Sequence, residues 1–235
     1  TCALPIWCMV RELINLCRLK GVLRLVEPTA GRQFDKLTQM TLATKYFDVP
    51  KWEYNLNHRA DSAERVTKPL DPELLETPWR RFVYTNILDV SRLNPSYPWL
   101  IQDKADGQHD STIVYIAGKC FGFRIVRRRD QEGPTDWREN INTDHQDSWE
   151  IYDLPESLQN SCRALMKDLK LLYGRLDFIV DSKDKHWFLE VNSNGQYGWL
   201  DEGDEDLTLH NTVFDAVLDP ANTIPFIGGG SFVDE

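Results

Sequence analysis

The run Leu172-Tyr-Gly-Arg-Leu-Asp-Phe-Ile-Val-Asp181, followed by His186-Trp-Phe-Leu-Glu-Val-Asn-Ser-Asn-Gly-Gln196, decides the fold of this chain. In the first run every second residue is apolar, at Leu176, Phe178 and Val180. This period of two is typical of a β-strand with one buried face. The charged segment 181–185 has the length and composition of a hairpin connection. We therefore expect two antiparallel strands joined by a tight turn.

Oxygen-bearing side chains lie on both strands of this expected hairpin. Asp177 belongs to the first strand, and alternation in the second strand predicts one face that carries Phe188, Glu190 and Asn192. An unpaired buried charge is costly, whereas carboxylate and amide oxygens are ligands that Mg²⁺ prefers. We predict that Asp177, Glu190 and Asn192 bind Mg²⁺, with Mn²⁺ as an alternative ion. The competing interpretation is an edge hairpin with a solvated polar face.

These residues carry a family resemblance. Gly174-Arg-Leu-Asp177 followed by Phe188-Leu-Glu-Val-Asn192 resembles the C-terminal metal-binding hairpin of the ATP-grasp ligases. The longer run that starts at Phe188 and ends at Leu200 is similar to the branch with the microviridin-type ligases, which cross-link side chains of a ribosomally made peptide. Upstream segments resemble other family motifs in the same order, namely Asp35–Leu37 with Gln39 and Ala43, Val49–Pro50, Val66–Pro69, Pro98–Gln102 and Asp136–Arg138. The resemblance covers residues 10 to 215.

The resemblance implies an α+β ATP-grasp fold, in which two α+β lobes grip the nucleotide. We expect residues 35–103 to form the N-lobe and residues 104–218 the C-lobe with the metal-binding hairpin. Residues 1–34 would be a remnant of the α/β domain that precedes this fold in the family, and residues 219–235 a flexible tail. Because the chain lacks an initiator Met, we expect a fragment whose preceding domain is truncated or missing.

The resemblance also implies contacts with ATP. Lys68 is expected to bind its phosphates as a point charge, although a lysine on a strand is otherwise an exposed lysine. Gln102, Asp103 and Lys104 are expected to bind adenine through backbone groups at the hinge; the alternative is an ordinary strand exit. Arg138 is the candidate catalytic residue, because its planar guanidinium suits phosphate or acyl-phosphate oxygens. A structural arginine stacked on the neighbouring tryptophan is the competing interpretation.

Two departures from the family pattern concern activity. The family commonly has Asp-x-Arg at the start of the strand after the hinge, where this chain reads His109-Asp-Ser-Thr112. This difference removes a cation expected near the phosphates or the acyl group, and rescue of activity by Arg at Ser111 would show that the departure causes any deficit. The hinge reads Gln-Asp-Lys-Ala, where the family favours Gln-Glu and a bulky apolar residue. Ser193 also replaces the usual Pro after the metal-binding Asn.

Composition narrows the functional class. The 235 residues carry a formal charge of −10, which argues against a nucleic-acid binder with its basic footprint. No run of 18 apolar residues predicts a membrane span. The cysteines are odd in number and irregular in spacing, at Cys2, Cys8, Cys17, Cys120 and Cys162. A disulfide framework or zinc site is therefore not expected, and a reduced cytoplasm is the natural setting.

Mixed helices and strands are expected along the rest of the chain. Helical spacing or composition predicts helices at residues 7–20, 35–46, 157–172 and 207–218. Short apolar runs predict strands at residues 22–26, 66–70, 82–85, 100–102, 112–116 and 120–126. Residues 133–147 are polar and are expected to form a loop. Without βαβ regularity, this order favours α+β over a parallel sheet.

The preferred function is an ATP-dependent carboxylate–amine or carboxylate–hydroxyl ligase that acts through an acyl phosphate on a ribosomally made peptide. The expected partners are a precursor peptide or another carboxylate or amine substrate, and a homodimer is compatible with the resemblance. One alternative is a degenerate, non-catalytic ATP-grasp protein that binds nucleotide or peptide. Another is an amino-acid or glutamate ligase of the same fold.

Overall fold

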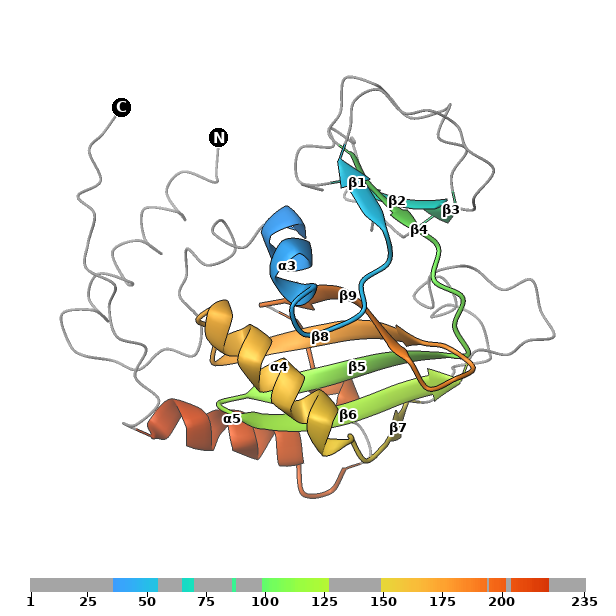
Figure 1. The fold of residues 1–235 in the computed structure, drawn as a ribbon. Coiled ribbons are helices and arrows are strands. Elements are labelled where there is room, and N and C mark those ends of the chain that lie inside the picture. Colours follow the sequence, from blue (N-terminus) through green and yellow to red (C-terminus); the bar gives the residue numbers. More distant parts are fainter. Residues whose placement is uncertain are drawn as a thin grey trace, which may run out of the picture.

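The computed structural model describes residues 36–54, 65–69, 86–87, 99–126, 149–193, 195–201 and 204–219. Within these ranges the chain forms two antiparallel β-sheets, with helices packed on both faces of the larger one (Figure 1). None of the described helices is long and apolar enough to cross a membrane.

The larger sheet has five strands in the order β7-β6-β5-β8-β9. The strands are β5 (His109–Ile116), β6 (Lys119–Val126), β7 (Glu150–Ile151), β8 (Tyr173–Val180) and β9 (His186–Asn192). Ala117 and Gly118, both with positive φ, connect β5 to β6, as expected for a two-residue hairpin turn. The predicted hairpin is confirmed: β8 and β9 are antiparallel neighbours, and residues 181–185 connect them.

The smaller sheet has four strands in the order β1-β4-β2-β3. These are β1 (Trp52–Tyr54), β2 (Arg65–Pro69), β3 (Asn86–Ile87) and β4 (Trp99–Asp103). Figure 1 shows this sheet beyond the β9 edge of the larger one. Two connections run between the sheets, residues 44–51 before β1 and residues 104–108 after β4.

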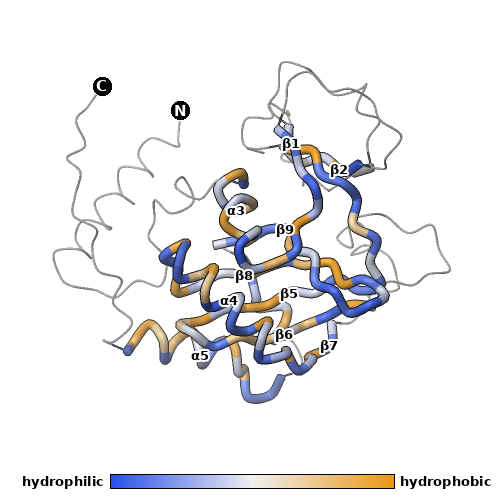
Figure 2. The backbone as a smooth tube through the Cα atoms, in the orientation of Figure 1, coloured by the Kyte–Doolittle hydropathy of each residue, from blue (hydrophilic) through white to orange (hydrophobic). Residues whose placement is uncertain are grey.

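Three helices of the described residues cover the larger sheet: α3 (Lys36–Ala43), α4 (Glu156–Asp168) and α5 (Thr208–Leu218). Helices α3 and α4 pack on one face, where Met40, Leu165 and Leu176 share a core. Helix α5 packs on the opposite face, where Leu209 joins Val114. In Figure 2, α4 alternates between hydrophilic and hydrophobic residues along its length, as an amphipathic surface helix does.

The sequence-based helices at 35–46, 157–172 and 207–218 and strands at 66–70, 100–102, 112–116 and 120–126 are confirmed with shifted ends. The helix at 7–20, the strands at 22–26 and 82–85, the loop at 133–147 and residues 220–235 of the tail lie outside the described residues. Helix α3, which we expected to begin the N-lobe, buries Met40 and Ala43 in the core of the larger sheet. The proposed domain boundaries stay predictions.

The expectation that Phe188 shares a face with Glu190 and Asn192 is wrong. Phe178 pairs with Phe188 and Asp177 pairs with Glu190, so β9 has one extra residue at this point. Such a β-bulge shifts the alternation of side chains along the strand. Phe188 is therefore fully buried in the core shared with α3 and α4, while Glu190 is only half-buried.

Candidate functional site

The polar face of the β8–β9 hairpin brings the three predicted metal ligands together. Asp177 pairs with Glu190 across the strands, and Arg175 pairs with Asn192 two positions along. On β8 the buried residues alternate with half-buried ones, so Arg175 and Asp177 share the face opposite the α3–α4 core. The bulge in β9 keeps Glu190 opposite Asp177 and Asn192 opposite Arg175. The hairpin therefore places two carboxylates, one amide and one guanidinium in adjacent positions.

Asp177 is held by two neighbours. The Thr112 hydroxyl donates to its Oδ1 at 2.7 Å from the adjacent strand β5. Arg175 Nε donates to Oδ1 and Arg175 Nη2 donates to Oδ2, both at 3.2 Å. The Asp177 side chain retains 23% of its exposure, so it still faces solvent in part. The carboxylate is thus fixed in orientation while remaining accessible to a ligand.

Two influences raise the pKa of Asp177 above its ordinary value. Burial is the larger, because it disfavours the charged form, and the Glu190 carboxylate across the strand adds to it. The Arg175 charge and the Thr112 hydrogen bond lower the pKa and oppose both effects. Two carboxylates that repel each other at adjacent positions form a site where bound positive charge is favourable.

The turn after β9 packs against the same arginine. Gly195 N donates to Asn192 O at 3.1 Å, and Tyr173 Oη donates to the Gly195 carbonyl. A Cβ at Gly195 would lie 2.6 Å from the Cβ of Arg175, so only glycine fits this close approach. Arg175 Nη1 donates to Gln196 O at 3.1 Å. The Gly-Gln turn and the hairpin face are therefore one packed unit.

Arg175 is the functional candidate that the sequence analysis did not single out. Its side chain is 14% exposed, and its hydrogen bonds to Asp177 and to Gln196 O use all three guanidinium nitrogens. Its Cζ lies 6.0 Å from the ring centre of Trp199. The signal was present in Gly174-Arg-Leu-Asp177, because residues two apart on a strand share a face.

Comparisons with known proteins identify the architecture. No family model and no curated protein match the chain. Among solved structures, the RiPP-associated ATP-grasp ligase of Chryseobacterium gregarium, solved with ADP and a leader and core peptide, has a TM-score of 0.78 at 22% identity over 95% of this chain and 71% of that one. The macrocyclase MdnC of Microcystis aeruginosa MRC, bound to precursor peptide MdnA, has a TM-score of 0.66 at 20% identity over 83% of this chain and 64% of that one.

A D-alanine–D-alanine ligase from Bacillus anthracis is also similar, with a TM-score of 0.53 at 17% identity over 78% of this chain and 66% of that one. The chain has the ATP-grasp fold. It is α+β, as the resemblance implied, with helices and antiparallel sheets. This chain spans less than two thirds of the length of the macrocyclase MdnC.

The donor set on the ATP-grasp hairpin fits a hard divalent cation. Two carboxylates and an amide supply the oxygen ligands that Mg²⁺ prefers. No group of three or more His, Cys, Asp or Glu that could hold a metal ion lies together among the described residues, so a metal site here would need the amide of Asn192 as a third donor. Asn192 is exposed on the last residue of β9, where a bound ion is accessible from solvent.

The residues predicted to bind ATP lie on the other sheet of the ATP-grasp fold. Lys68 is in β2, where its backbone pairs with Leu100 of β4; its side chain lies outside what the structure describes. Gln102 is 2% exposed in β4, and its Nε2 donates to the Met40 sulfur of α3 at 3.8 Å. Asp103 ends β4, and Lys104 begins the connection toward the larger sheet. Gln102, Asp103 and Lys104 therefore lie at the junction between the two sheets, whereas Lys68 lies within the smaller sheet.

Arg138 lies outside the described residues. The structure therefore describes no contact for the residue that the sequence analysis chose as catalytic. Its expected role at phosphate or acyl phosphate stays a prediction.

At the start of β5 the sequence departs from the Asp-x-Arg pattern of the family. In this segment Thr112, and not Ser111, contacts the polar face of the hairpin. Ser111 lies on the opposite face, where its Oγ is 3.0 Å from Tyr152 Oη. Thr112 pairs with Asp177 and donates to it. Strand alternation therefore directs the side chain at position 111 away from the hairpin carboxylates, and the effect of Arg at Ser111 on activity stays a prediction.

Proposed function

We propose that this protein is an ATP-dependent ligase that joins a carboxylate to an amine or a hydroxyl of a ribosomally made peptide. The observation that carries the proposal is the polar face of the β8–β9 hairpin, where Asp177 pairs with Glu190 beside the fixed guanidinium of Arg175. Support for a peptide substrate comes from the similar structures solved with a precursor peptide or with a leader and core peptide.

The proposed reaction has two balanced steps. A carboxylate oxygen attacks the γ-phosphorus of ATP, the bond to the bridging oxygen breaks, and ADP leaves with that electron pair. The amine nitrogen or hydroxyl oxygen then attacks the acyl carbon, the bond to the phosphate oxygen breaks, and phosphate leaves. The attacking group loses its proton to solvent or to a nearby base. The products are an amide or ester, ADP and phosphate.

Different residues of the hairpin would have different roles in this reaction. Asp177, Glu190 and Asn192 would hold Mg²⁺ or Mn²⁺, and the ion would supply positive charge to the phosphate oxygens. Arg175 offers a second positive charge that is already held in place, because Asp177 and Gln196 O fix its guanidinium. A cation fixed before the reaction stabilises developing negative charge without a cost of reorganisation.

The nucleotide contacts belong to the same proposal. Lys68 and Arg138 would bind phosphates, and the backbone of residues 102–104 would bind adenine. The position of Gln102 and Asp103 in the last residues of β4, next to the connection between the sheets, supports the hinge role. A homodimer and a cytoplasmic location stay predictions.

One observation favours a second candidate, a non-catalytic nucleotide- or peptide-binding protein. Thr112 donates to Asp177 from β5, one residue after Ser111, the position at which the sequence analysis expects a cation. A hydroxyl supplies a hydrogen bond but no charge, so phosphate oxygens near Asp177 would be less well neutralised. Binding could persist while turnover is lost.

Calorimetric titration of the protein with a non-hydrolysable ATP analogue, with and without Mg²⁺, tests the nucleotide site. Phosphate release in the presence of ATP, Mg²⁺ and a precursor peptide tests ligation, and free amino acids serve as the comparison acceptors. Mg²⁺-dependent binding with peptide-dependent phosphate release supports the ligase. Binding without release favours the second candidate, and release with amino acids alone favours an amino-acid ligase. No nucleotide binding would overturn both ligase candidates and would leave the non-catalytic protein with peptide binding alone.

A further inference from the structure

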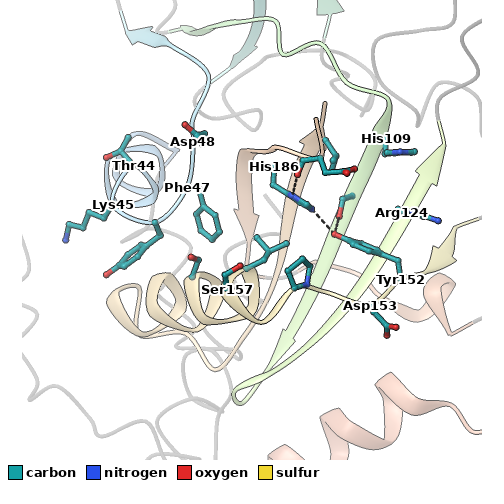
Figure 3. Close-up of a pocket in the computed structure, with 17 residues that line it drawn as sticks. Thr44, Lys45, Phe47, Asp48, His109, Arg124, Tyr152, Asp153, Ser157 and His186 are labelled. Carbon is teal, nitrogen blue, oxygen red and sulfur yellow. Dashed lines mark hydrogen bonds between the residues drawn. The ribbon is translucent and has the colours of Figure 1, made fainter. Parts of the chain in front are cut away.

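A cavity of about 690 Å³ opens on the face of the larger sheet opposite the hairpin carboxylates (Figure 3). The strands at its base contribute His109, Ser111, Arg124, Val180 and His186. Its rim comes from residues 44–48 before β1 and from residues 152–161 around the start of α4. The proposed ligase chemistry uses none of these side chains.

A chain of hydrogen bonds crosses the wall of this cavity. Ser111 Oγ is 3.0 Å from Tyr152 Oη, which is 3.0 Å from His186 Nε2. His186 Nδ1 is 3.1 Å from the Asp184 carbonyl oxygen. Figure 3 shows the ring of Tyr152 between His186 and Arg124. Three strands and the segment before α4 thus meet at one tyrosine.

The carbonyl acceptor at one end determines which atom donates in each of these three hydrogen bonds. A carbonyl can only accept, so His186 Nδ1 carries a hydrogen. Burial lowers the pKa of His186, which favours the neutral ring and leaves Nε2 as an acceptor. Tyr152 therefore donates to His186 and accepts from Ser111. The ring of Tyr152 is held in one position.

Beside this tyrosine lie two buried nitrogen atoms without a partner. Among the described residues, His109 Nδ1 and Arg124 Nε are buried and make no hydrogen bond. Arg124 Cζ lies 5.8 Å from the ring centre of Tyr152, and its Nη2 is 3.7 Å from the Glu150 carboxylate. The two residues form an ion pair, but that separation is too long for a hydrogen bond. A buried donor left unsatisfied is costly, so a ligand that accepts from it gains affinity.

We propose that this cavity binds a carboxylate group through Arg124 and His109. The guanidinium carries a fixed positive charge and several N–H groups in a planar fork, which matches the two oxygens of a carboxylate. Among the other charged groups at the cavity, Asp48 pairs with Lys185 at 3.0 Å and Lys45 pairs with Asp168 at 3.3 Å, and Asp153 and Asp184 also belong to its lining. Arg124 is therefore the cation of the cavity best placed to take a new anion.

The size of the cavity indicates what carries the carboxylate. A volume of 690 Å³ lies in the range of sites that enclose drug-sized ligands, which is much larger than one carboxylate. Phe47, Leu158 and Val180 add apolar wall to the same cavity. The carboxylate can belong to the side chain of an acidic residue in a peptide or to a free organic acid. Both present the same group to Arg124.

The proposal goes beyond the ligase function and does not depend on it. The cavity lies on the face of the sheet away from Asp177, and its ligand needs neither ATP nor a metal ion. Binding can therefore be measured in the full chain without nucleotide. Failure of the ligase proposal would leave this measurement intact.

Calorimetric titration with two probes tests the site. One probe is glutarate, and the other is the blocked peptide acetyl-Leu-Ala-Glu-Ala-Leu-amide (the Glu peptide). The control is the same peptide with Gln in place of Glu (the Gln peptide). We expect the Gln peptide to bind at least about tenfold more weakly than the Glu peptide, since it lacks the charge that pairs with arginine. Equal affinity for glutarate and the Glu peptide identifies a free acid as sufficient. Binding of the peptide alone identifies an acidic side chain in a peptide.

Matched variants locate the binding. Arg124→Gln should lower the affinity for the Glu peptide at least about tenfold. Lys119→Gln removes the same charge from the exposed start of β6 and should leave this affinity unchanged. His109→Phe keeps an aromatic ring at this position and removes Nδ1, so it gives a second readout if Arg124→Gln fails to fold. Binding of neither probe, equal binding of the Gln peptide, or unchanged affinity in His109→Phe and folded Arg124→Gln would overturn the proposal.

Discussion

Arg175 donates to both carboxylate oxygens of Asp177, from Nε and from Nη2, at 3.2 Å each. The two residues are two positions apart on β8, so their side chains project from the same face of one strand. A guanidinium that also donates to Gln196 O cannot rotate away without breaking three hydrogen bonds. The cation beside the candidate metal ligands is therefore fixed by the fold itself.

Replacement of Arg175 by Lys should lower kcat for ligation by about 10²-fold, because lysine keeps the charge but loses the planar fork. Steady-state phosphate release with ATP and peptide measures the effect. Arg163→Lys is the matched control, since Arg163 also uses its fork, toward Gly118 O and Gln159, but lies on α4. Equal losses in the two variants would mean that Arg175 acts only on stability.

Glu190→Gln should abolish Mg²⁺-dependent binding of an ATP analogue. The substitution keeps the shape of the side chain and removes one of the two carboxylates that face each other across β8 and β9. It also removes a neighbour that raises the pKa of Asp177, so the pKa of Asp177 should fall. Calorimetry with and without Mg²⁺ measures the first effect. Mg²⁺-dependent affinity equal to that of the unchanged protein would exclude Glu190 as a ligand.

The hairpin could be predicted from sequence because strand alternation is a local property. Leu176, Phe178 and Val180 alternate with Asp177, Ile179 and Asp181, and the structure buries the first three on one face. The bulge could not be predicted, because it depends on the distant Phe47. That ring lies 5.2 Å from Phe178 and 5.6 Å from Phe188, and this packing draws Phe188 into the core.

The role of Arg175 and the cavity on the other face needed three-dimensional information. The sequence places Arg175 beside Asp177, but its third hydrogen bond goes to a turn 21 residues further along the chain. The residues of the cavity come from four strands, one helix and three connections, so no local pattern contains them. Sequence alone also could not show whether Ser111 or Thr112 contacts Asp177, because the answer depends on the register of β5 against β8.

Ser111→Arg and Thr112→Arg should differ in outcome. At Ser111 the new guanidinium would face Arg124, its cross-strand neighbour, and would break the contact with Tyr152, so we expect a loss of about 1 kcal/mol in unfolding free energy. At Thr112 the guanidinium would meet Asp177, and phosphate release should rise if the missing cation limits turnover. Denaturant unfolding and phosphate release measure the two effects. Higher activity in Ser111→Arg alone would contradict the assignment of faces.

Asp201→Ala should destabilise the fold by about 1–2 kcal/mol, the usual range for loss of a helix cap. Asp201 is 5% exposed, and its oxygens accept from Leu209 N at 3.1 Å and from His210 N at 2.9 Å in the first turn of α5. Asp201→Asn keeps one acceptor oxygen and should lose less. Denaturant unfolding compares the two variants, and equal losses would show that the charge, not the acceptor geometry, supports α5.

Acidification should weaken the fold through His186. Burial lowers the pKa of His186 below its ordinary value, while hydrogen bonding to the Asp184 carbonyl and the charges of Asp184 and Asp181 oppose this effect. Between the folded and unfolded pKa values the unfolded chain binds more protons, so the stabilisation is complete above about pH 6.5 and decreases as the pH falls toward the folded value. Protonation of Nε2 also removes the acceptor that Tyr152 uses.

The matched variants His186→Gln and Lys183→Gln test this dependence. Unfolding free energy measured from pH 7.5 to pH 5 should fall less steeply in His186→Gln than in the unchanged protein, because the titrating ring is gone. Lys183 lies exposed in the turn between β8 and β9, so its variant should keep the full slope. A slope that persists in His186→Gln would assign the pH dependence to another group.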